Sequence, residues 1–174
     1  MTKFLLACLA TLLAACSPLP PKGIEPVSPF ALERYLGKWY EIARLDHSFE
    51  RGLSDIQAVY SLNPDGSVRV LNRGYDLERK AWREAVGRAV FTGSPDQGAL
   101  KVSFFGPFYG GYNVIALDPA YRWAMVMGPD RSYLWILSRD RKLAEPVREM
   151  LVQKARAVGI DTDKLIWVSQ QRED

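Results

Sequence analysis

The chain contains little of what metal-binding and thiol-dependent proteins require. Among its 174 residues there are one histidine and two cysteines, too few for a zinc site with Cys and His ligands or for a disulfide framework. The 23 basic and 20 acidic residues are interleaved along the sequence, so no basic face for nucleic acid is expected. We therefore predict a protein with no metal, no cofactor and no nucleic-acid partner.

Apolar and aromatic residues, in contrast, are plentiful. Hydrophobic residues make up 48% of the chain and charged residues 25%, a composition that is typical of globular proteins and too apolar for a disordered one. Five Trp, eight Tyr and seven Phe give 20 aromatic residues. The length fits one domain with a sizeable core, and the aromatic content indicates that this domain needs large, rigid side chains.

The first 15 residues have the features of a segment that is removed after export. Lys3 supplies a positive start, residues 4–13 form an apolar run, and two alanines precede Cys16. A positive start, a short apolar core and a small-residue exit are typical of a secretory signal peptide. The apolar run is too short for a transmembrane helix.

The end of this segment, Leu-Ala-Ala-Cys at residues 13–16, resembles the lipobox of bacterial lipoproteins. The resemblance implies that Cys16 is acylated and becomes the new N-terminus. It also implies passage to the outer membrane, because Ser17 and not Asp follows the cysteine. Two or more acyl chains would anchor the protein stably in a membrane.

A proline-rich stretch follows the cysteine. Residues 17–29 contain five prolines, which favours an extended, semi-rigid spacer. We therefore divide the chain into a signal peptide (1–15), a tether that begins with lipidated Cys16 (16–29) and a folded domain (30–174).

The folded domain alternates short apolar segments with turn signals. Asn-Pro-Asp-Gly at residues 63–66 is typical of a hairpin connection, and apolar and charged residues alternate clearly in Val68-Arg69-Val70. Short strands joined by hairpins predict an all-β fold, an antiparallel sheet closed on itself as an up-and-down β-barrel. The eight predicted strands lie near residues 38–46, 54–62, 67–74, 81–91, 99–105, 111–118, 122–128 and 133–138.

One helix is predicted after the eighth strand. Pro146 suits a first helical turn and Gly159 suits the C-terminal stop. We expect this C-terminal α-helix to pack on the outside of the barrel, and a last short strand at residues 165–168. The apolar stripe of the helix consists of Val147, Met150, Leu151, Ala155 and Val158.

Two short motifs carry a resemblance to a known family. Gly37-Lys38-Trp39 stands at the start of the first predicted strand, and Arg139 ends the eighth, just before the helix. This order resembles the lipocalin family over about residues 30–170. The segment 105–118 looks like the bacterial outer-membrane lipoprotein branch of that family. The resemblance implies an eight-stranded barrel that encloses a small apolar ligand.

Gly37, Trp39 and Arg139 form the structural signature in this resemblance. We expect Trp39 to plug one end of the barrel and the planar guanidinium of Arg139 to lie over its indole. Such a cation–π contact contributes about 0.5–2 kcal/mol. The pair is expected to stabilise the fold and to take no part in ligand chemistry.

Alternation along the strands assigns an inward face that is apolar and aromatic, with few polar groups. An eight-stranded barrel is wide enough for one small ligand, and this lining suits a long apolar ligand with a polar end. The same side chains could also simply fill the barrel. Alternation further turns Ala43, Ala116 and Met127 inward. The predicted ligand-binding residues are Tyr60, Asn72, Phe104, Tyr112, Val114, Met125, Tyr133 and Trp135.

Three further features have open interpretations. Inward-facing Glu41 needs a partner, which is either an arginine or a ligand head group. The aromatic loop at residues 104–111 lies at the barrel mouth and could touch lipid, close the mouth, form a dimer interface or pack on itself. His47 is flanked by Asp46 and Ser48, but neighbours in a strand point to opposite faces, so a structural or rim role is favoured over a catalytic triad.

The resemblance implies a lipid carrier, not an enzyme. It would be anchored in the outer membrane, face the periplasm, and bind fatty acids or lysophospholipids for storage or transport in membrane maintenance. Its partners would be that ligand and the membrane through Cys16. A homodimer with a second copy is left open. The alternatives are a lipocalin-like isomerase, with Glu41 and Tyr60 or Tyr112 as an acid–base pair, and a structural lipoprotein with a filled barrel.

Overall fold

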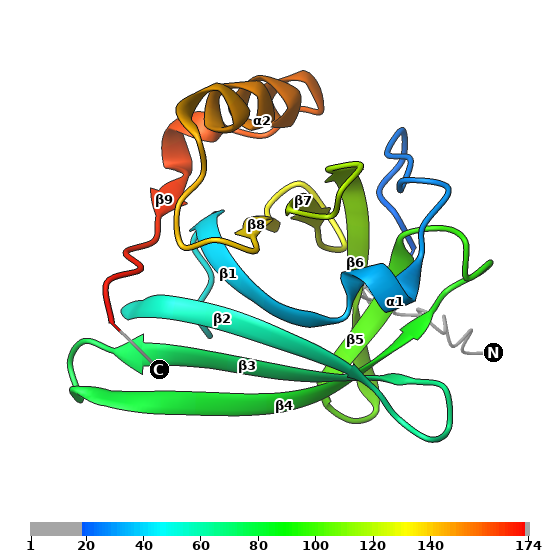
Figure 1. Cartoon of the computed structure of the whole chain (residues 1–174), viewed down its shortest axis with the longest axis horizontal. Coiled ribbons are helices and arrows are strands. Elements are labelled where there is room, and N and C mark those ends of the chain that lie inside the picture. The colour runs from blue at the N-terminus through cyan, green and yellow to red at the C-terminus, as the bar shows by residue number, and fades with distance from the viewer. Residues whose placement is uncertain (1–18, 173–174) are drawn as a thin grey trace, which may run out of the picture.

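Eight strands follow one another around a closed barrel in the computed structural model, which describes residues 19–172 (Figure 1). Each strand pairs antiparallel with the next, and the first also pairs with the eighth, which closes the sheet. The predicted all-β up-and-down barrel is therefore confirmed. The strands are β1 (Gly37–Arg44), β2 (Leu53–Leu62), β3 (Val68–Asp76), β4 (Ala81–Phe91), β5 (Ala99–Phe105), β6 (Phe108–Leu117), β7 (Trp123–Met127) and β8 (Leu134–Ser138).

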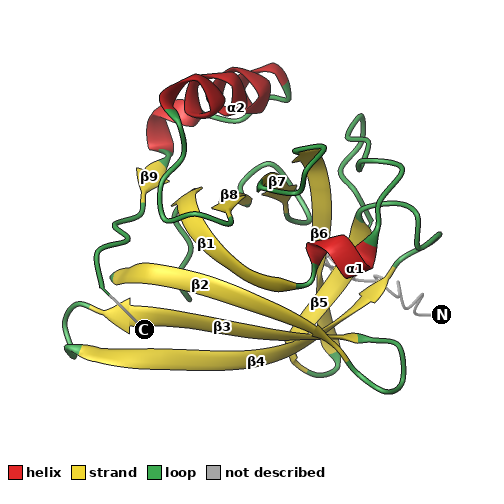
Figure 2. Ribbon diagram, in the orientation of Figure 1, coloured by secondary structure: helices red, strands yellow, loops and turns green. Residues whose placement is uncertain are grey.

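Helices and a ninth strand lie outside the closed sheet (Figure 2). The short helix α1 (Leu32–Tyr35) precedes β1, and the long helix α2 (Glu145–Ala157) follows β8. A 3₁₀ turn, η1 (Thr162–Lys164), leads into β9 (Ile166–Trp167), which pairs with the C-terminal end of β1. Within residues 19–172, no helix is long and apolar enough to cross a membrane.

The helix α2 packs on the outer wall of the barrel through a narrow stripe. Leu151 and Ala155 are fully buried there, and Val147 and Val158 pack beside them. Met150, which the sequence pattern assigned to the same stripe, is 39% exposed. It lies at the edge of the packed face, so the contact is narrower than predicted.

Apolar side chains form two clusters, one inside the barrel and one between its wall and α2. The inner cluster contains Trp39 and side chains from most of the strands. The outer cluster joins β1, β6, β7 and β8 to the helix. The strand β7 has a packed cluster on both faces, so four of its five residues are buried.

Because the chain reverses at every hairpin, its loops fall at two ends of the barrel. The loops 63–67, 92–98 and 118–122 share one end with the start of β1, which we call the closed end. The loops 45–52, 77–80, 106–107 and 128–133 lie at the opposite end, which we call the mouth.

Two β-bulges change which side chains face the interior. The register shifts between Glu41 and Ala43 in β1 and between Val114 and Ala116 in β6. As a result Ala43 and Ala116, which strict alternation turned inward, pack in the outer cluster instead. The bulge in β1 also brings the next residue, Arg44, to the inner face.

The segment before α1 is docked along the barrel and is not a free spacer. Ile24 is buried in the outer cluster, and Val27 donates its N–H to the carbonyl of Val114 at 2.8 Å. The tether predicted for residues 16–29 is therefore too long, because its second half belongs to the folded body. The predicted signal peptide and Cys16 lie outside the described residues.

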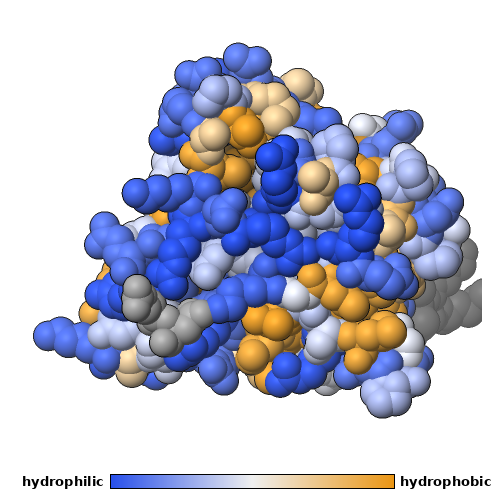
Figure 3. Space-filling model, in the orientation of Figure 1, coloured by the Kyte–Doolittle hydropathy of each residue, from blue (hydrophilic) through white to orange (hydrophobic). Residues whose placement is uncertain are grey.

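One outer face of the sheet carries an apolar row. In Figure 3 apolar side chains gather in the lower middle of the view, over β2 and β3, among hydrophilic neighbours. The strand register places Val59, Leu71 and Val86 side by side across β2, β3 and β4, and Val86 is 52% exposed. The homodimer considered above stays a prediction, and this row is a surface at which to test it.

Candidate ligand-binding site

The closed end of the barrel is sealed by Trp39. Its side chain has no exposed surface, and its Nε1 donates to the carbonyl of Tyr35 at 2.7 Å. The Cζ atom of Arg139 lies 3.8 Å from the centre of the Trp39 ring, so the expected contact is present. Gly37 has φ +92°, a conformation that side chains other than glycine rarely adopt, and a Cβ there would lie 3.4 Å from the guanidinium of Arg139.

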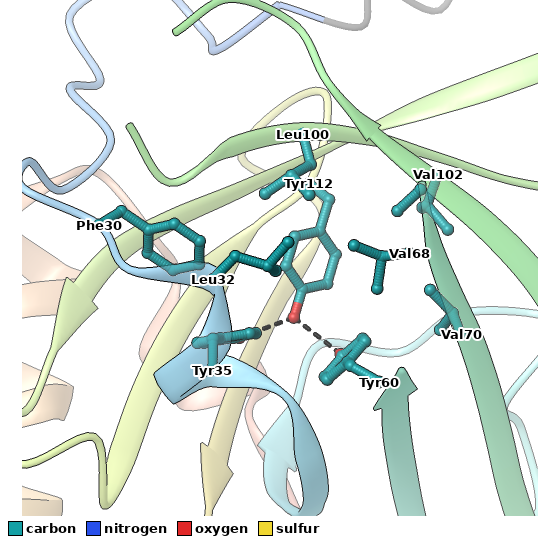
Figure 4. A pocket seen from close by; sticks show the side chains of 10 residues that line it. Phe30, Leu32, Tyr35, Tyr60, Val68, Val70, Leu100, Val102 and Tyr112 are labelled. Atoms are coloured by element: carbon teal, nitrogen blue, oxygen red, sulfur yellow. Dashed lines mark hydrogen bonds between the residues drawn. The ribbon is translucent and has the colours of Figure 1, made fainter. Parts of the chain in front are cut away.

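A narrow cavity lies inside the barrel next to this plug (Figure 4). As its side chains stand, it has room for about one water molecule. A lipid chain would therefore have to displace side chains to enter. The lining is apolar and aromatic and consists of Phe30, Leu32, Tyr35, Tyr60, Val68, Val70, Ala89, Leu100, Val102 and Tyr112.

Three tyrosines form a hydrogen-bonded chain at this cavity. The Tyr112 hydroxyl lies 2.8 Å from that of Tyr35 and 2.7 Å from that of Tyr60 (Figure 4). Burial raises the pKa of all three hydroxyls above the usual value of 10.0, so they are neutral at physiological pH. Because the hydroxyls pair with one another, they fit into a lining that is otherwise apolar.

A charged cluster lies on the mouth side of the barrel interior. The Nη1 of Arg44 donates to Oε1 of Glu41 at 3.1 Å, and its Nη2 donates to the backbone carbonyl of Glu50 at 3.0 Å. The indole Nε1 of Trp135 donates to Oε2 of Glu50 at 3.0 Å. Arg44, Glu41 and Glu50 are all buried, so this cluster places polar groups inside a largely apolar barrel interior, which we call the cup.

The carboxyl groups of this cluster hold their protons more tightly than exposed ones. Burial raises the pKa of Glu41 well above its usual value, the charge of Glu50 adds to the effect, and Arg44 offsets only part of it. Burial also raises the pKa of Glu50, while the hydrogen bond from Trp135 lowers it. The Nε of Arg44 has no hydrogen-bond partner among the described residues, so one buried donor is left for another acceptor.

Five of the eight predicted ligand-binding residues line the cavity or pack in or against the inner cluster. Tyr60 and Tyr112 line the cavity, Val114 belongs to the inner cluster, and Trp135 packs against that cluster. Phe104 packs against the same cluster, and its ring fills the place of a side chain on Gly87, where a Cβ would lie 2.8 Å from it. A role for these residues in ligand binding stays a prediction.

The other three are placed differently. Asn72 shares the inner face of β3 with Val68 and Val70 and sits opposite Ala58, but it is not part of the cavity lining. Tyr133 lies in a mouth loop and stacks on His47, with ring centres 4.5 Å apart. The inward orientation of Met125 is wrong, as is that of Met127, because both pack under α2 in the outer cluster.

Sequence reasoning missed Arg44 and the contribution of the segment before β1. Strict alternation puts Arg44 on the outer face, and only the bulge, for which the sequence offers no clear signal, turns it inward. Phe30, Leu32 and Tyr35 line the cavity from α1 and its approach. Their aromatic and apolar character next to the Trp39 motif was a signal that could have found them.

The structure does not bring the considered catalytic groups together. Glu41 is bonded to Arg44 and Tyr60 to Tyr112, so no carboxyl–phenol pair forms. Burial lowers the pKa of His47 to about 4, and the imidazole stacks between aromatic rings. In the part of the chain from residue 19 to 172, no group of three His, Cys, Asp or Glu side chains could hold a metal ion.

A closed eight-stranded barrel with an apolar interior, a plugged end and a helix on its wall belongs to the class of β-barrels that enclose small apolar molecules. The particular family follows from the sequence match. The protein-family model described as a Lipocalin-like domain matches residues 30–170. The chain therefore belongs to the lipocalin family.

Relatives with similar sequences cover nearly the whole chain. The chain is 55% identical to the outer membrane lipoprotein Blc of Escherichia coli K12 over 165 residues, which cover 94% of this chain and 93% of the relative. It is 38% identical to temperature-induced lipocalin-1 of Arabidopsis thaliana over 154 residues, which cover 83% and 81%.

A solved structure supports the fold in the same way. Insecticyanin from the tobacco hornworm Manduca sexta superposes with a TM-score of 0.69 at 24% identity, covering 90% of this chain and 89% of the other. At this identity the likeness concerns the fold alone.

Proposed function

We propose that this protein is a lipid-anchored lipocalin of the outer membrane that faces the periplasm and binds fatty acids or lysophospholipids for storage or transport, without catalysis. The observation that carries the proposal is the closed interior, which is apolar at the cavity and contains the charged Arg44 cluster on its mouth side. This arrangement suits a molecule with one acyl chain and one polar head.

The charged cluster indicates where the head group would lie. An acyl chain in the cavity leaves its head toward the mouth, on the side of Arg44. The free Nε of that guanidinium can donate to a carboxylate or phosphate oxygen, the acceptors that arginine binds best. A cationic head group without such an oxygen would gain nothing from this donor.

Anchoring and location rest on other observations. The lipobox ends at Cys16, and the bacterial relatives bear the name outer membrane lipoprotein. We extend both to this chain, with acylation of Cys16 as its attachment to the membrane. A carrier held in this way stays beside the lipids that it would collect.

The first test fills the cavity inside the barrel with a larger side chain. Ala89 is buried in the cavity wall, and Val86 lies on the outer face of the same strand. We expect Ala89→Phe to weaken binding of lysophospholipid at least about tenfold, a loss of about 1.4 kcal/mol, because the ring occupies the space of the acyl chain. Val86→Phe is the matched control and should bind normally. Native mass spectrometry and quenching of tryptophan fluorescence measure both.

The outcomes separate the alternatives. Absence of binding to the natural chain at micromolar lipid would contradict the carrier and favour the structural lipoprotein. Turnover of a bound lipid would instead support an enzyme. Mass analysis of the lipids that co-purify with the protein identifies the ligand directly.

A further inference from the structure

An exposed aromatic pair stands at the mouth of the barrel. Phe105 and Phe108 are 83% and 77% exposed, more than any other large apolar side chain in residues 19–172. They face each other across the β5–β6 hairpin and flank its tip, Gly106-Pro107. Aromatic side chains this exposed at a hairpin tip mark a contact with another apolar body.

The N-terminal segment joins the barrel at the same end. The carbonyl of Lys22 accepts a hydrogen bond from Nη2 of Arg131 at 3.1 Å, and Arg131 belongs to the mouth loop between β7 and β8. In that loop, Pro129 lies against Gly111 of the aromatic hairpin, where a Cβ would come within 3.3 Å of it. The chain therefore enters the folded body beside the base of this hairpin.

The path of this segment fixes which end an anchor would hold. From Lys22 the chain runs along the outer wall to Phe30, whose N–H donates to the carbonyl of Asp96 in a closed-end loop. Only five residues separate Cys16 from Lys22, and the six Cα-to-Cα steps between them span at most about 20 Å. An acylated Cys16 would thus hold the mouth end of the barrel close to the membrane.

We propose that the mouth of the barrel faces the membrane and that Phe105 and Phe108 insert into the lipid surface. This rests on the acylation of Cys16 included in the proposed function. In this orientation a lipid can pass between the bilayer and the cup without crossing water. The burial of aromatic rings at the interface then adds to the hold of the anchor.

Electrostatic attraction contributes little to membrane contact at the mouth of the barrel. The exposed basic and acidic residues of the mouth loops nearly balance, so attraction to anionic lipid is weak. Contact made by apolar side chains is insensitive to salt, whereas contact made by surface charge is screened. The basic residues are Arg51, Arg79, Lys80 and Arg131, and the acidic ones are Asp46, Glu78 and Asp130.

The test places a label at each end of the lipidated protein in vesicles of phosphatidylethanolamine and phosphatidylglycerol. Gly106→Cys labels the aromatic tip, where a Cβ meets open space, and Gln97→Cys labels an exposed closed-end loop. We expect spin-labelled phospholipid to quench a fluorophore at 106 several-fold more strongly than one at 97, at low and high salt alike. Equal quenching, or stronger quenching at 97, would overturn the proposal.

A second variant isolates the aromatic pair. Phe105→Ser combined with Phe108→Ser should reduce quenching at 106 several-fold and leave the unfolding midpoint and lysophospholipid binding unchanged, because both rings are exposed outside the cup. Unchanged quenching would contradict insertion.

Failure of the orientation and failure of the carrier are distinguishable in these preparations. Lysophospholipid binding without a difference in quenching overturns the orientation alone. A difference in quenching without lysophospholipid binding overturns the carrier alone. Mass analysis of the N-terminal peptide reports acylation of Cys16, and its absence would overturn the orientation.

Discussion

Arg139 holds the closed end together through more than its contact with Trp39. Its guanidinium donates to the carbonyl of Lys38 at 2.7 Å and to those of Leu36 and Arg34 at 2.9 Å. A further bond at 3.3 Å reaches Tyr121. One side chain thus ties α1, β1 and the β6–β7 loop to the end of β8.

We expect Arg139→Ala to lower the free energy of unfolding by about 2–4 kcal/mol, since bonds to a charged donor contribute about 1.5–3 kcal/mol each and part of this site is exposed. Urea unfolding followed by tryptophan fluorescence measures the loss. The matched control is Arg148→Ala, because Arg148 lies 3.7 Å over the Trp167 ring on the outer surface. That change should cost under about 1 kcal/mol. An unchanged midpoint in Arg139→Ala would contradict the structural role.

At the residue scale, the sequence predicts the surroundings of a side chain that belongs to a recognisable motif. It does not predict the direction of a side chain next to an irregularity of the backbone. Trp39 and Arg139 could be paired in advance because both belong to the motifs that resemble the lipocalin family. Arg44 could not be placed, because one extra residue in β1 reverses its direction and this insertion leaves no mark in the hydrophobic pattern.

At the element scale, the strands were predictable because turn residues and alternation mark nearly every boundary. The faces of β7 were not, since Trp-Ala-Met-Val-Met is apolar throughout. Such a strand is covered on both sides, by the inner cluster and by α2, and alternation then carries no information. Met125 and Met127 were misplaced for this reason.

We expect the conformation of the β1–β2 loop, residues 45–52, to depend on pH. His47 stacks between Phe49 and Tyr133, with ring centres 5.3 and 4.5 Å away. From the same loop, Glu50 reaches into the cup and binds Trp135. The His47 side chain has a pKa lowered to about 4 by burial, so the closed loop favours the neutral imidazole.

Acid should therefore open this loop. Between pH 6.5 and about 4, His47 is protonated when the loop is open but stays neutral when the loop is packed on the barrel. The free energy that favours the packed loop therefore falls by about 1.4 kcal/mol per pH unit. We expect amide exchange in residues 45–52, corrected for intrinsic rates, to accelerate over this range. His47→Phe, which keeps the stack but cannot titrate, should abolish the acceleration. Equal acceleration in that variant would contradict the role of His47.

At the scale of the whole molecule, the barrel has an apolar interior that also contains charged groups. Removing an interior charge from water is costly unless it is paired, and here Arg44 is shared between Glu41 and the backbone of Glu50. The cluster therefore makes the stability of the entire fold depend on pH, in a direction opposite to that of His47.

The sign of this dependence can be tested with Glu41→Gln. Because the pKa of Glu41 is raised in the folded state, the folded protein keeps a proton that the unfolded chain releases above about pH 4.5, and stability falls as pH rises. His47 acts oppositely below pH 6.5, so its effect offsets the decline between about pH 4.5 and 6.5. Glu50 also has a raised pKa and acts in the same direction as Glu41. Glu41→Gln should therefore reduce the decline, which urea unfolding from pH 5 to 9 measures, while exposed Glu84→Gln should leave it unchanged. An undiminished decline in Glu41→Gln would show that another group causes it.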